Sequence, residues 1–143
     1  VCYESVYGDY CRGYVLKGAR ALTIITNDAW WGNTPGYRQH LSYASLRAIE
    51  TRRAIARCGN TGISALIDNK GRIVEEGPWW QPATLHFRLP LNDELTFFVT
   101  HGDITGRLCS FTFLLLLTAA LVKGIVNRGY NKAHQRRAEN SEA

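Results

Sequence analysis

Residues 34–58, "TPGYRQHLSYASLRAIETRRAIARC", decide the fold. Apolar residues recur in this stretch at helical spacing and fall near one face of a helix: Leu41, Ala44, Ala48 and Ile55. Arg38, Arg52 and Arg53 fall elsewhere on it. This periodicity predicts one long amphipathic helix over the whole stretch.

Strand patterns lie on both sides of the predicted helix. Residues 19–28, "ARALTIITND", have a continuous apolar centre, which predicts a buried strand ending at Asn27 and Asp28. Residues 62–77, "GISALIDNKGRIVEEG", predict a hairpin that turns through Asn69, Lys70 and Gly71.

Three further segments complete the pattern. Residues 7–19 predict a helix that closes near Gly18. Residues 84–91, "TLHFRLPL", alternate and predict a half-buried strand, and residues 94–103 predict another extended segment. Helices interleaved with strands indicate an α/β layered domain.

The basic charge is concentrated at the end of the chain. The net charge is +5, and residues 123–143 hold five Lys or Arg against two Glu, so the preceding body is near neutral. A nucleic-acid-binding body would carry a clustered basic face, so we expect no nucleic-acid partner. The cysteines are irregularly spaced, which argues against a zinc site and against a disulfide framework. They are Cys2, Cys11, Cys58 and Cys109.

The most hydrophobic stretch is "RLCSFTFLLLLTAALVKGIVN", residues 107–127. Residues 107–126 are long enough for a transmembrane helix if Lys123 reaches the interface, and a buried core helix is the alternative. We therefore expect a domain at 1–106, a transmembrane helix at 107–126 and a basic, disordered tail at 127–143. The positive-inside rule puts that tail in the cytoplasm and the body on the other side of the membrane.

Cys2 is the first candidate for chemistry. A turn leading into a helix can give a cysteine exposure and nearby backbone N–H groups, both of which a nucleophile needs. The alternative is an ordinary small apolar residue, since most free cysteines are buried. Glu4 could act on a proton or orient a neighbour, although an acidic residue near a helix start is commonly a stabilising charge.

Two loops are also candidates. The adjacent Trp30 and Trp31, in "NDAWWGNTPG", could line the mouth of a pocket or meet lipid headgroups, or one of them could simply pack. Residues 60–62, in "RCGNTGIS", could line a site with backbone or form only a turn. His40 and His101 have no metal-ligand spacing, so we expect structural or solvated roles and no metal.

Taken together, these motifs resemble the apolipoprotein N-acyltransferases, membrane members of the nitrilase (carbon–nitrogen hydrolase) superfamily. "CYES", "TNDAWWG", the run from "QHLSYASLRAIE" to "NTGISALIDNKGRI" and "TFFVTHGD" occur in that family's order. The resemblance covers residues 1–126. It implies the C-terminal part of a nitrilase-like αββα sandwich followed by one transmembrane helix.

The resemblance also implies a chemistry and a place. The cysteine of the C-Y-E motif, here Cys2, would take an acyl chain from a phospholipid as a thioester. It would pass the chain to the amino group of diacylglyceryl-cysteine on an apolipoprotein, without a cofactor. Tyr3 and Glu4 match residues needed beside the nucleophile. Trp30, with Trp31 and Asn27 in the same loop, matches the substrate entrance. The domain would lie on the periplasmic side of a bacterial inner membrane.

The same resemblance implies that part of the machinery lies outside these residues. In the superfamily, the general-base glutamate and the oxyanion-binding lysine precede the C-Y-E motif. We therefore expect this chain to be a C-terminal fragment that is inactive alone. Two alternatives remain: a nitrilase-type amidase acting on a small amide, and a non-catalytic remnant.

Overall fold

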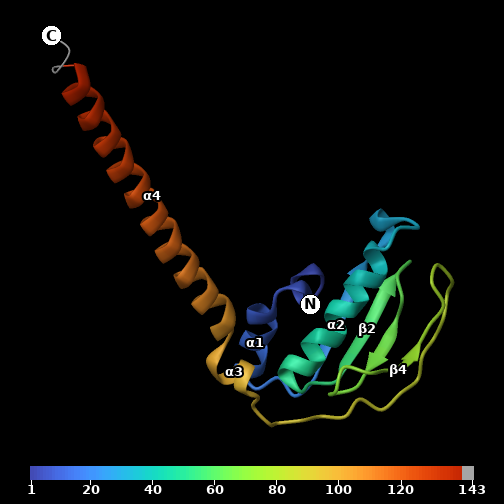
Figure 1. The fold of residues 1–143 in the computed structure, drawn as a ribbon. Helices are drawn as coiled ribbons and strands as arrows, with labels where there is room; N and C mark the ends of the chain where they lie inside the picture. The colour runs from blue at the N-terminus through green and yellow to red at the C-terminus, as the bar shows by residue number, and fades with distance from the viewer. Residues whose placement is uncertain (140–143) are drawn as a thin grey trace. The chain divides into compact units, whose positions relative to one another are not determined.

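The computed structural model describes the backbone of residues 1–139 and the side chains of residues 1–129. It divides into two compact units, residues 1–102 and residues 103–143. The first unit is mixed α/β, as predicted, and contains one four-stranded sheet in the order β1-β2-β3-β4 (Figure 1).

The sheet joins one parallel pair of strands to an antiparallel hairpin. The strands are β1 (Leu22–Asn27), β2 (Ile55–Asn60), β3 (Ala65–Ile67) and β4 (Ile73–Glu76). β1 and β2 run parallel, with Leu22 opposite Ile55. β3 is antiparallel to both β2 and β4. The predicted hairpin is therefore confirmed, and Gly71 supplies the positive φ, 81°, that its turn requires.

Helices cover one face of the sheet. α1 (Gly8–Leu16) and α2 (Gly36–Thr51) each pack one apolar face toward it, and Figure 1 shows α2 lying along β2. The resulting core takes residues from every layer: Cys11, Leu22, Ile24, Leu41, Ala44, Ala48, Ile55, Ala65 and Ile67. α1 closes at Lys17 with Gly18 at a φ of 95°, where the sequence predicted the end of the helix.

The long predicted helix was wrong in its last part, residues 52–58. α2 ends at Thr51, Arg52 adopts a left-handed conformation, and the chain then enters β2. The local residues favour a helix, but Ile55–Asn60 pairs with strands on both sides, and this tertiary pairing overrides the local preference.

β1 is also less buried than predicted. Its side chains alternate between buried and exposed, so Leu22, Ile24 and Thr26 face the helices. On the opposite face, Ile25 is 66% exposed, since no element of this unit covers that side of β1. The continuous apolar run in the sequence suits burial on both faces, which one layer of helices does not provide.

The two segments predicted as later strands are not strands. Residues 84–91 join no sheet, and Pro90 could not donate a ladder hydrogen bond. Residues 97–101 form the short helix α3 (Phe97–His101). Thr96 caps it, because its hydroxyl accepts a hydrogen bond from the Val99 N–H at 3.1 Å, while Val99 is fully buried.

Arg53 is buried and joins the end of α2 to two segments that are distant in the sequence. Its guanidinium donates hydrogen bonds to the carbonyls of Ala19 at 2.7 Å, Thr51 at 3.1 Å and Glu94 at 2.7 Å. Five donors in a rigid fork allow one arginine to satisfy several carbonyls at once. The connection that follows β4 is thereby fixed to the ends of α1 and α2.

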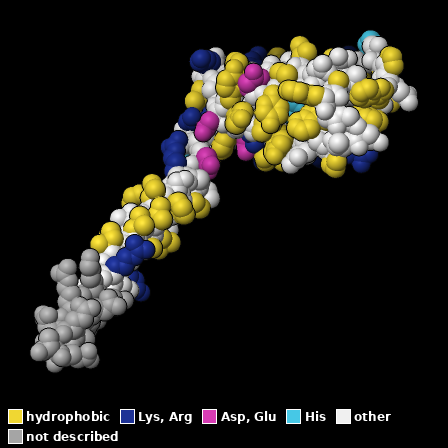
Figure 2. All heavy atoms as spheres, turned by 90° about the horizontal axis from the view of Figure 1, so that it is seen from above, with side chains coloured by type: hydrophobic (Ala, Val, Ile, Leu, Met, Phe, Trp, Pro, Cys, Tyr) yellow, Lys and Arg dark blue, Asp and Glu magenta, His cyan; other side chains and the backbone are white. Residues whose placement is uncertain are grey.

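The second unit is dominated by one helix, α4 (Ile104–Glu139). Its segment Ile104–Gly129 is long and apolar enough to cross a membrane, and its side chains are not buried. At 1.5 Å per residue, the 26 residues measure about 39 Å, more than the ~30 Å of a bilayer core. Figure 2 shows hydrophobic side chains along this helix and Lys and Arg side chains near the ends of the apolar stretch.

The expected disordered tail is helical where its backbone is described. α4 continues through residues 127–139, which are rich in good helix formers such as Ala, Lys, Arg and Gln. Extending a helix that already exists is easier than starting one, so the apolar segment supports this continuation. Residues 140–143 of the predicted tail lie outside the described residues.

Candidate functional site

Cys2 lies where the edge of the sheet passes into a helical turn. The Ile25 N–H donates to the Val1 carbonyl at 2.8 Å, and the Val1 nitrogen donates to the Thr23 carbonyl at 3.2 Å, so Val1 pairs with β1. The next residues form the 3₁₀-helix η1 (Tyr3–Val6). We call residues 2–6 the Cys2 turn. Cys2 is exposed in it, as a nucleophile must be.

Glu4 stabilises the backbone of this turn. Its carboxylate accepts a hydrogen bond from the Cys2 N–H at 2.9 Å. Hydrogen bonds from its own backbone N–H and from that of Cys2 lower the pKa of Glu4, so it is ionised at neutral pH. The carboxylate therefore holds the backbone of the nucleophile candidate, and among the described contacts none joins it to the sulfur.

The thiol of Cys2 is at the end of a short chain of hydrogen bonds. Cys2 Sγ lies 3.5 Å from Thr26 Oγ1, which in turn lies 3.3 Å from Asp28 Oδ1. Thr26 has one hydroxyl proton, and the ionised Asp28 accepts it. In this arrangement the thiol donates to Thr26 and the hydroxyl donates to Asp28.

Asp28 belongs to a buried polar network. Its carboxylate lies 2.9 Å from His40 Nδ1 and 2.6 Å from Arg57 Nη2. All three residues are at most 3% exposed. Burial by itself would raise the pKa of Asp28, but hydrogen bonds from Arg57 and His40 outweigh it and lower that pKa. The carboxylate is thus a buried anion held by two neighbours.

The network reaches the Cys2 turn a second time. His40 Nε2 lies 3.3 Å from the hydroxyl of Ser5, which is fully buried. One position further along, the Val6 carbonyl accepts a hydrogen bond from Arg47 Nη1 at 2.8 Å. Both His40 and Arg47 lie on α2, so this helix fixes the far end of the Cys2 turn.

Sequence reasoning missed this network. Asp28 was predicted only to end a strand, Arg57 was placed in a helix, and His40 was expected to be structural or solvated. The available signal was the strand pattern of residues 55–58, where Ile55 and Arg57 share one face. A basic residue on the inner face of a strand needs an acidic partner, and Asp28 ends the neighbouring strand.

An apolar cavity lies beside the Cys2 turn. Tyr3, Trp30 and Trp31 line a space of about 250 Å³. Trp30 is 81% exposed, whereas Trp31 is half-buried and packs so closely on Gly36 that a Cβ there would lie 2.3 Å from its ring. One tryptophan therefore packs while the other faces solvent, and both share the cavity with the residue that follows Cys2.

Asn27 has a local role in this loop. Its side-chain oxygen accepts a hydrogen bond from the Ala29 N–H at 3.1 Å, just where the 3₁₀-helix η2 (Ala29–Trp31) begins. The side chain thus helps to shape the segment that carries the two tryptophans. Its predicted contact with substrate stays a prediction.

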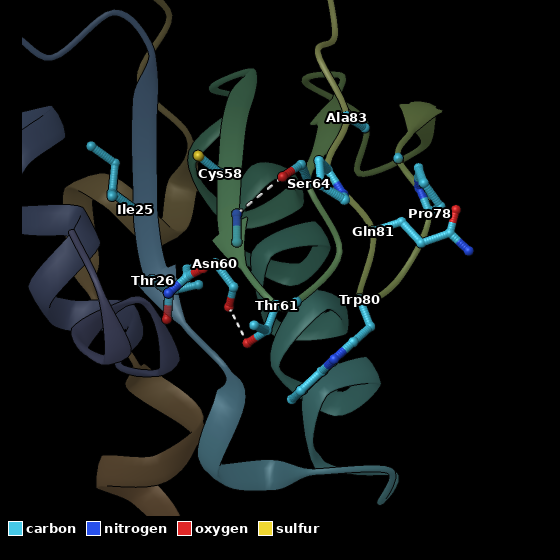
Figure 3. Close-up of a pocket in the computed structure, with 14 residues that line it drawn as sticks. Ile25, Thr26, Cys58, Asn60, Thr61, Ser64, Pro78, Trp80, Gln81 and Ala83 are labelled. Carbon is cyan, nitrogen blue, oxygen red and sulfur yellow. Dashed lines mark hydrogen bonds between the residues drawn. The ribbon is translucent and has the colours of Figure 1, made fainter.

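A larger pocket opens on the face of the sheet away from α2 (Figure 3). It measures about 530 Å³ and is lined by β1, β2 and the segment after β4, including Ile25, Thr26, Asn60 and Trp80. Thr61, with a φ of 60°, stands in the left-handed region at its edge. Thr26 is among the residues that line this pocket, although its side chain lies on the helix face of β1, where its Oγ1 contacts the Cys2 thiol.

Residues 60–62 form a turn whose backbone passes close to the carboxylate of Asp28. A Cβ on Gly62 would lie 2.3 Å from Asp28 Oδ2, so only glycine allows the backbone this close to the buried carboxylate. The Ile63 carbonyl accepts a hydrogen bond from Arg57 Nη1. Within residues 1–129, no three acidic, histidine or cysteine side chains are grouped to hold a metal ion.

Known proteins place this chain in a family. Residues 1–94 match the model of the carbon–nitrogen hydrolases. An apolipoprotein N-acyltransferase of Chlorobaculum tepidum is 41% identical over 124 residues, which are 86% of this chain and 23% of the relative. Proteins of the same name from Geobacter metallireducens and Bdellovibrio bacteriovorus are 35% and 36% identical, over 94% and 89% of this chain and 25% and 23% of the relatives.

The chain spans about a quarter of the length of these curated relatives. The matched residues include the Cys2 turn, the tryptophan loop and the whole sheet. By this match the chain belongs to the carbon–nitrogen hydrolase family.

Proposed function

We propose that this chain carries the nucleophile of an acyltransferase that acylates lipoproteins. In this proposal Cys2 takes a fatty acyl chain from a phospholipid and passes it to the amino group of diacylglyceryl-cysteine on an apolipoprotein. The observation that carries the proposal is the exposed Cys2 beside an apolar cavity formed by Tyr3, Trp30 and Trp31. The names of the relatives support the same substrates.

The chemistry consists of two acyl transfers. The Cys2 sulfur attacks the ester carbonyl of the phospholipid, the carbon–oxygen bond breaks, and a lysophospholipid leaves as the alcohol. The amine of the acceptor then attacks the thioester, the carbon–sulfur bond breaks, and the thiol is restored. A thioester divides one difficult step into two easier steps.

Each step needs proton transfer and a partner for the developing oxyanion. Glu4 serves neither need in this proposal, because its carboxylate holds the Cys2 N–H. The described neighbour of the sulfur is Thr26, whose proton is directed to Asp28. A base and an oxyanion donor from outside residues 1–129 complete the site, as the family resemblance implies.

The apolar helix suits this function. We propose that residues 107–126, within α4, cross the bacterial inner membrane, with the basic residues 127–143 in the cytoplasm and residues 1–106 on the periplasmic side. The acyl donor would then be available in the same bilayer. An exposed Trp30 is suited to the headgroup region, where an aromatic ring meets both water and lipid.

The test is the capture of the acyl-enzyme. The natural gene product in detergent micelles is incubated with phospholipid without acceptor, and the peptide that contains Cys2 is weighed by mass spectrometry. We expect an acyl adduct that Cys2→Ser abolishes and Cys58→Ser, which alters another exposed cysteine, leaves intact. An adduct that survives Cys2→Ser would refute the proposal.

Two further measurements separate the alternatives. Hydrolysis of small soluble amides, with no acyl transfer from phospholipid, would favour an amidase. The purified 143-residue chain alone should form no product, because it lacks the expected base and lysine. Sustained turnover by that chain would contradict this expectation.

A further inference from the structure

We propose that His40, held by Asp28 and Arg57, is a positioning residue that fixes the Cys2 turn for reaction. The inference rests on the proposed function only in taking Cys2 as the nucleophile. It assigns a role to the buried side chains that the acyl-transfer chemistry above does not use.

The first argument is the energetics of burial. Asp28, His40 and Arg57 are buried between the sheet and α2, where apolar residues of similar size would usually be at least as stabilising. A buried ion pair is therefore weak evidence for a contribution to stability. We infer that the network serves to hold these side chains in one arrangement, because charge-assisted hydrogen bonds are short and directional.

The second argument is connectivity. The network touches the Cys2 turn at both ends: Thr26 contacts Cys2 Sγ at 3.5 Å, and His40 contacts Ser5 Oγ at 3.3 Å. Asp28 joins these two contacts, since its Oδ1 lies 3.3 Å from Thr26 Oγ1 and 2.9 Å from His40 Nδ1. Displacing Asp28 would therefore disturb both ends of the turn together.

The third argument concerns what His40 does not do. Its ring nitrogens face Asp28 and Ser5, and the ring is 3% exposed, so it does not meet substrate. Nδ1 carries a proton that goes to the Asp28 carboxylate, which leaves Nε2 as the acceptor for the Ser5 hydroxyl. His40 therefore acts through Ser5 on the position of Cys2.

Two substitutions separate the contact that His40 makes with Ser5 from the contact that it makes with Asp28. In His40→Gln the longer amide can reach Ser5 as Nε2 does, whereas in His40→Asn the shorter amide can reach Asp28 as Nδ1 does. Both remove the ring and neither adds a charge. If the role is positioning, the Gln variant retains more acylation of Cys2 than the Asn variant.

The experiment uses the natural gene product in micelles and has two readouts. Acyl-adduct formation on Cys2 is followed against phospholipid concentration, and hydrogen exchange is followed on the peptide covering residues 1–7. For His40→Asn we expect about a hundredfold lower kcat at unchanged KM, because a misplaced nucleophile costs rate rather than binding. Exchange in residues 1–7 should rise about fivefold or more while exchange in β2 stays unchanged.

Ser5→Ala is the milder variant in case the His40 variants do not fold. It removes only the hydroxyl that meets His40, and we expect about tenfold slower acylation. Thr51→Val is its matched control: Thr51 is equally buried on α2, and its hydroxyl donates to the backbone carbonyl of Arg47 at 2.7 Å rather than to His40 or Ser5. The control should lose stability without a change in the acylation rate.

The outcomes are distinct. Equal acylation and equal exchange in wild type, His40→Gln and His40→Asn would overturn the positioning role. So would an effect of Thr51→Val as large as that of Ser5→Ala. Wild type that forms no acyl adduct, with exchange in residues 1–7 still sensitive to His40→Asn, would refute the proposed function and leave the positioning of the turn standing.

Discussion

Gly62→Ala tests the close approach between the 60–62 turn and the buried carboxylate. The added methyl carbon would lie 2.3 Å from Asp28 Oδ2 and 2.9 Å from its Cγ. An ordinary contact starts near 3.4 Å, so the two groups must separate by about 1 Å. The carboxylate cannot retreat freely, because Arg57 and His40 hold it.

The cost follows from those contacts. A shift of about 1 Å would lengthen the 2.6 Å contact between Asp28 and Arg57 beyond hydrogen-bonding distance. Overpacking costs about 1–3 kcal/mol, and a broken buried ion pair costs about 3–5 kcal/mol. We expect Gly62→Ala to lower the free energy of unfolding by about 3 kcal/mol and the apparent Tm by about 10–20 °C.

Urea unfolding in micelles, followed by tryptophan fluorescence, measures this loss. Gly13→Ala is the matched control, because a Cβ there meets nothing within 4 Å, and alanine in the middle of α1 should stabilise by about 0.5–1 kcal/mol. The decisive comparison is Gly62→Ala in an Asp28→Ala background, where the obstacle is gone. Costs that simply add would refute the reasoning, since a direct contact predicts strong coupling.

Three further changes have definite expected results. The pKa of Asp28 is lower in the folded protein than in the unfolded chain, so its stabilising effect is complete above the unfolded pKa and is lost as the pH falls through the folded pKa. Asp28→Asn removes this titration and should therefore flatten the decline in Tm below about pH 4. Arg53→Lys keeps the charge but cannot reach the carbonyls of Ala19, Thr51 and Glu94 together, so urea titration should show a loss of about 2–4 kcal/mol. Leu115→Arg, at the middle of the apolar segment, should oppose insertion by about 3 kcal/mol and release part of the protein in alkaline extraction of membranes.

Local patterns predicted the elements whose signals are local. The turn at Gly71, the end of α1 near Gly18 and the apolar helix within α4 each depend on a few neighbouring residues. β2 was missed because "RRAIARC" has helical propensity, and only pairing with two other strands makes it extended. The capped helix α3 was readable from Thr96, but its aromatic residues favoured a strand.

The candidate site divides in the same way. Cys2, Tyr3 and Glu4 are consecutive, as are Trp30 and Trp31, so each group can be identified from a short motif. Asp28, His40 and Arg57 come from three elements, and their meeting depends on the register of β1 against β2 and on how α2 lies over them. The strand pattern of residues 55–58 was a signal for the pairing of Arg57 with Asp28, but it depended on recognising β2, which the helical propensity of the segment concealed. The roles in catalysis and substrate binding stay predictions for the residues that the motifs identified: Cys2, Tyr3, Glu4, Asn27, Trp30 and Trp31.

Arg53 has a consequence for how the first unit assembles. The Thr51 carbonyl is two residues away in the chain, whereas the Ala19 and Glu94 carbonyls come from distant segments, so Nε and Nη1 have all three partners only when both segments are in place. A partly assembled chain would leave the cation dehydrated and short of partners, which is costly. The side chain thus destabilises partly folded states in which the long connection after β4 has not yet packed against the ends of α1 and α2. Folding of residues 1–102 should accordingly be all-or-none rather than stepwise.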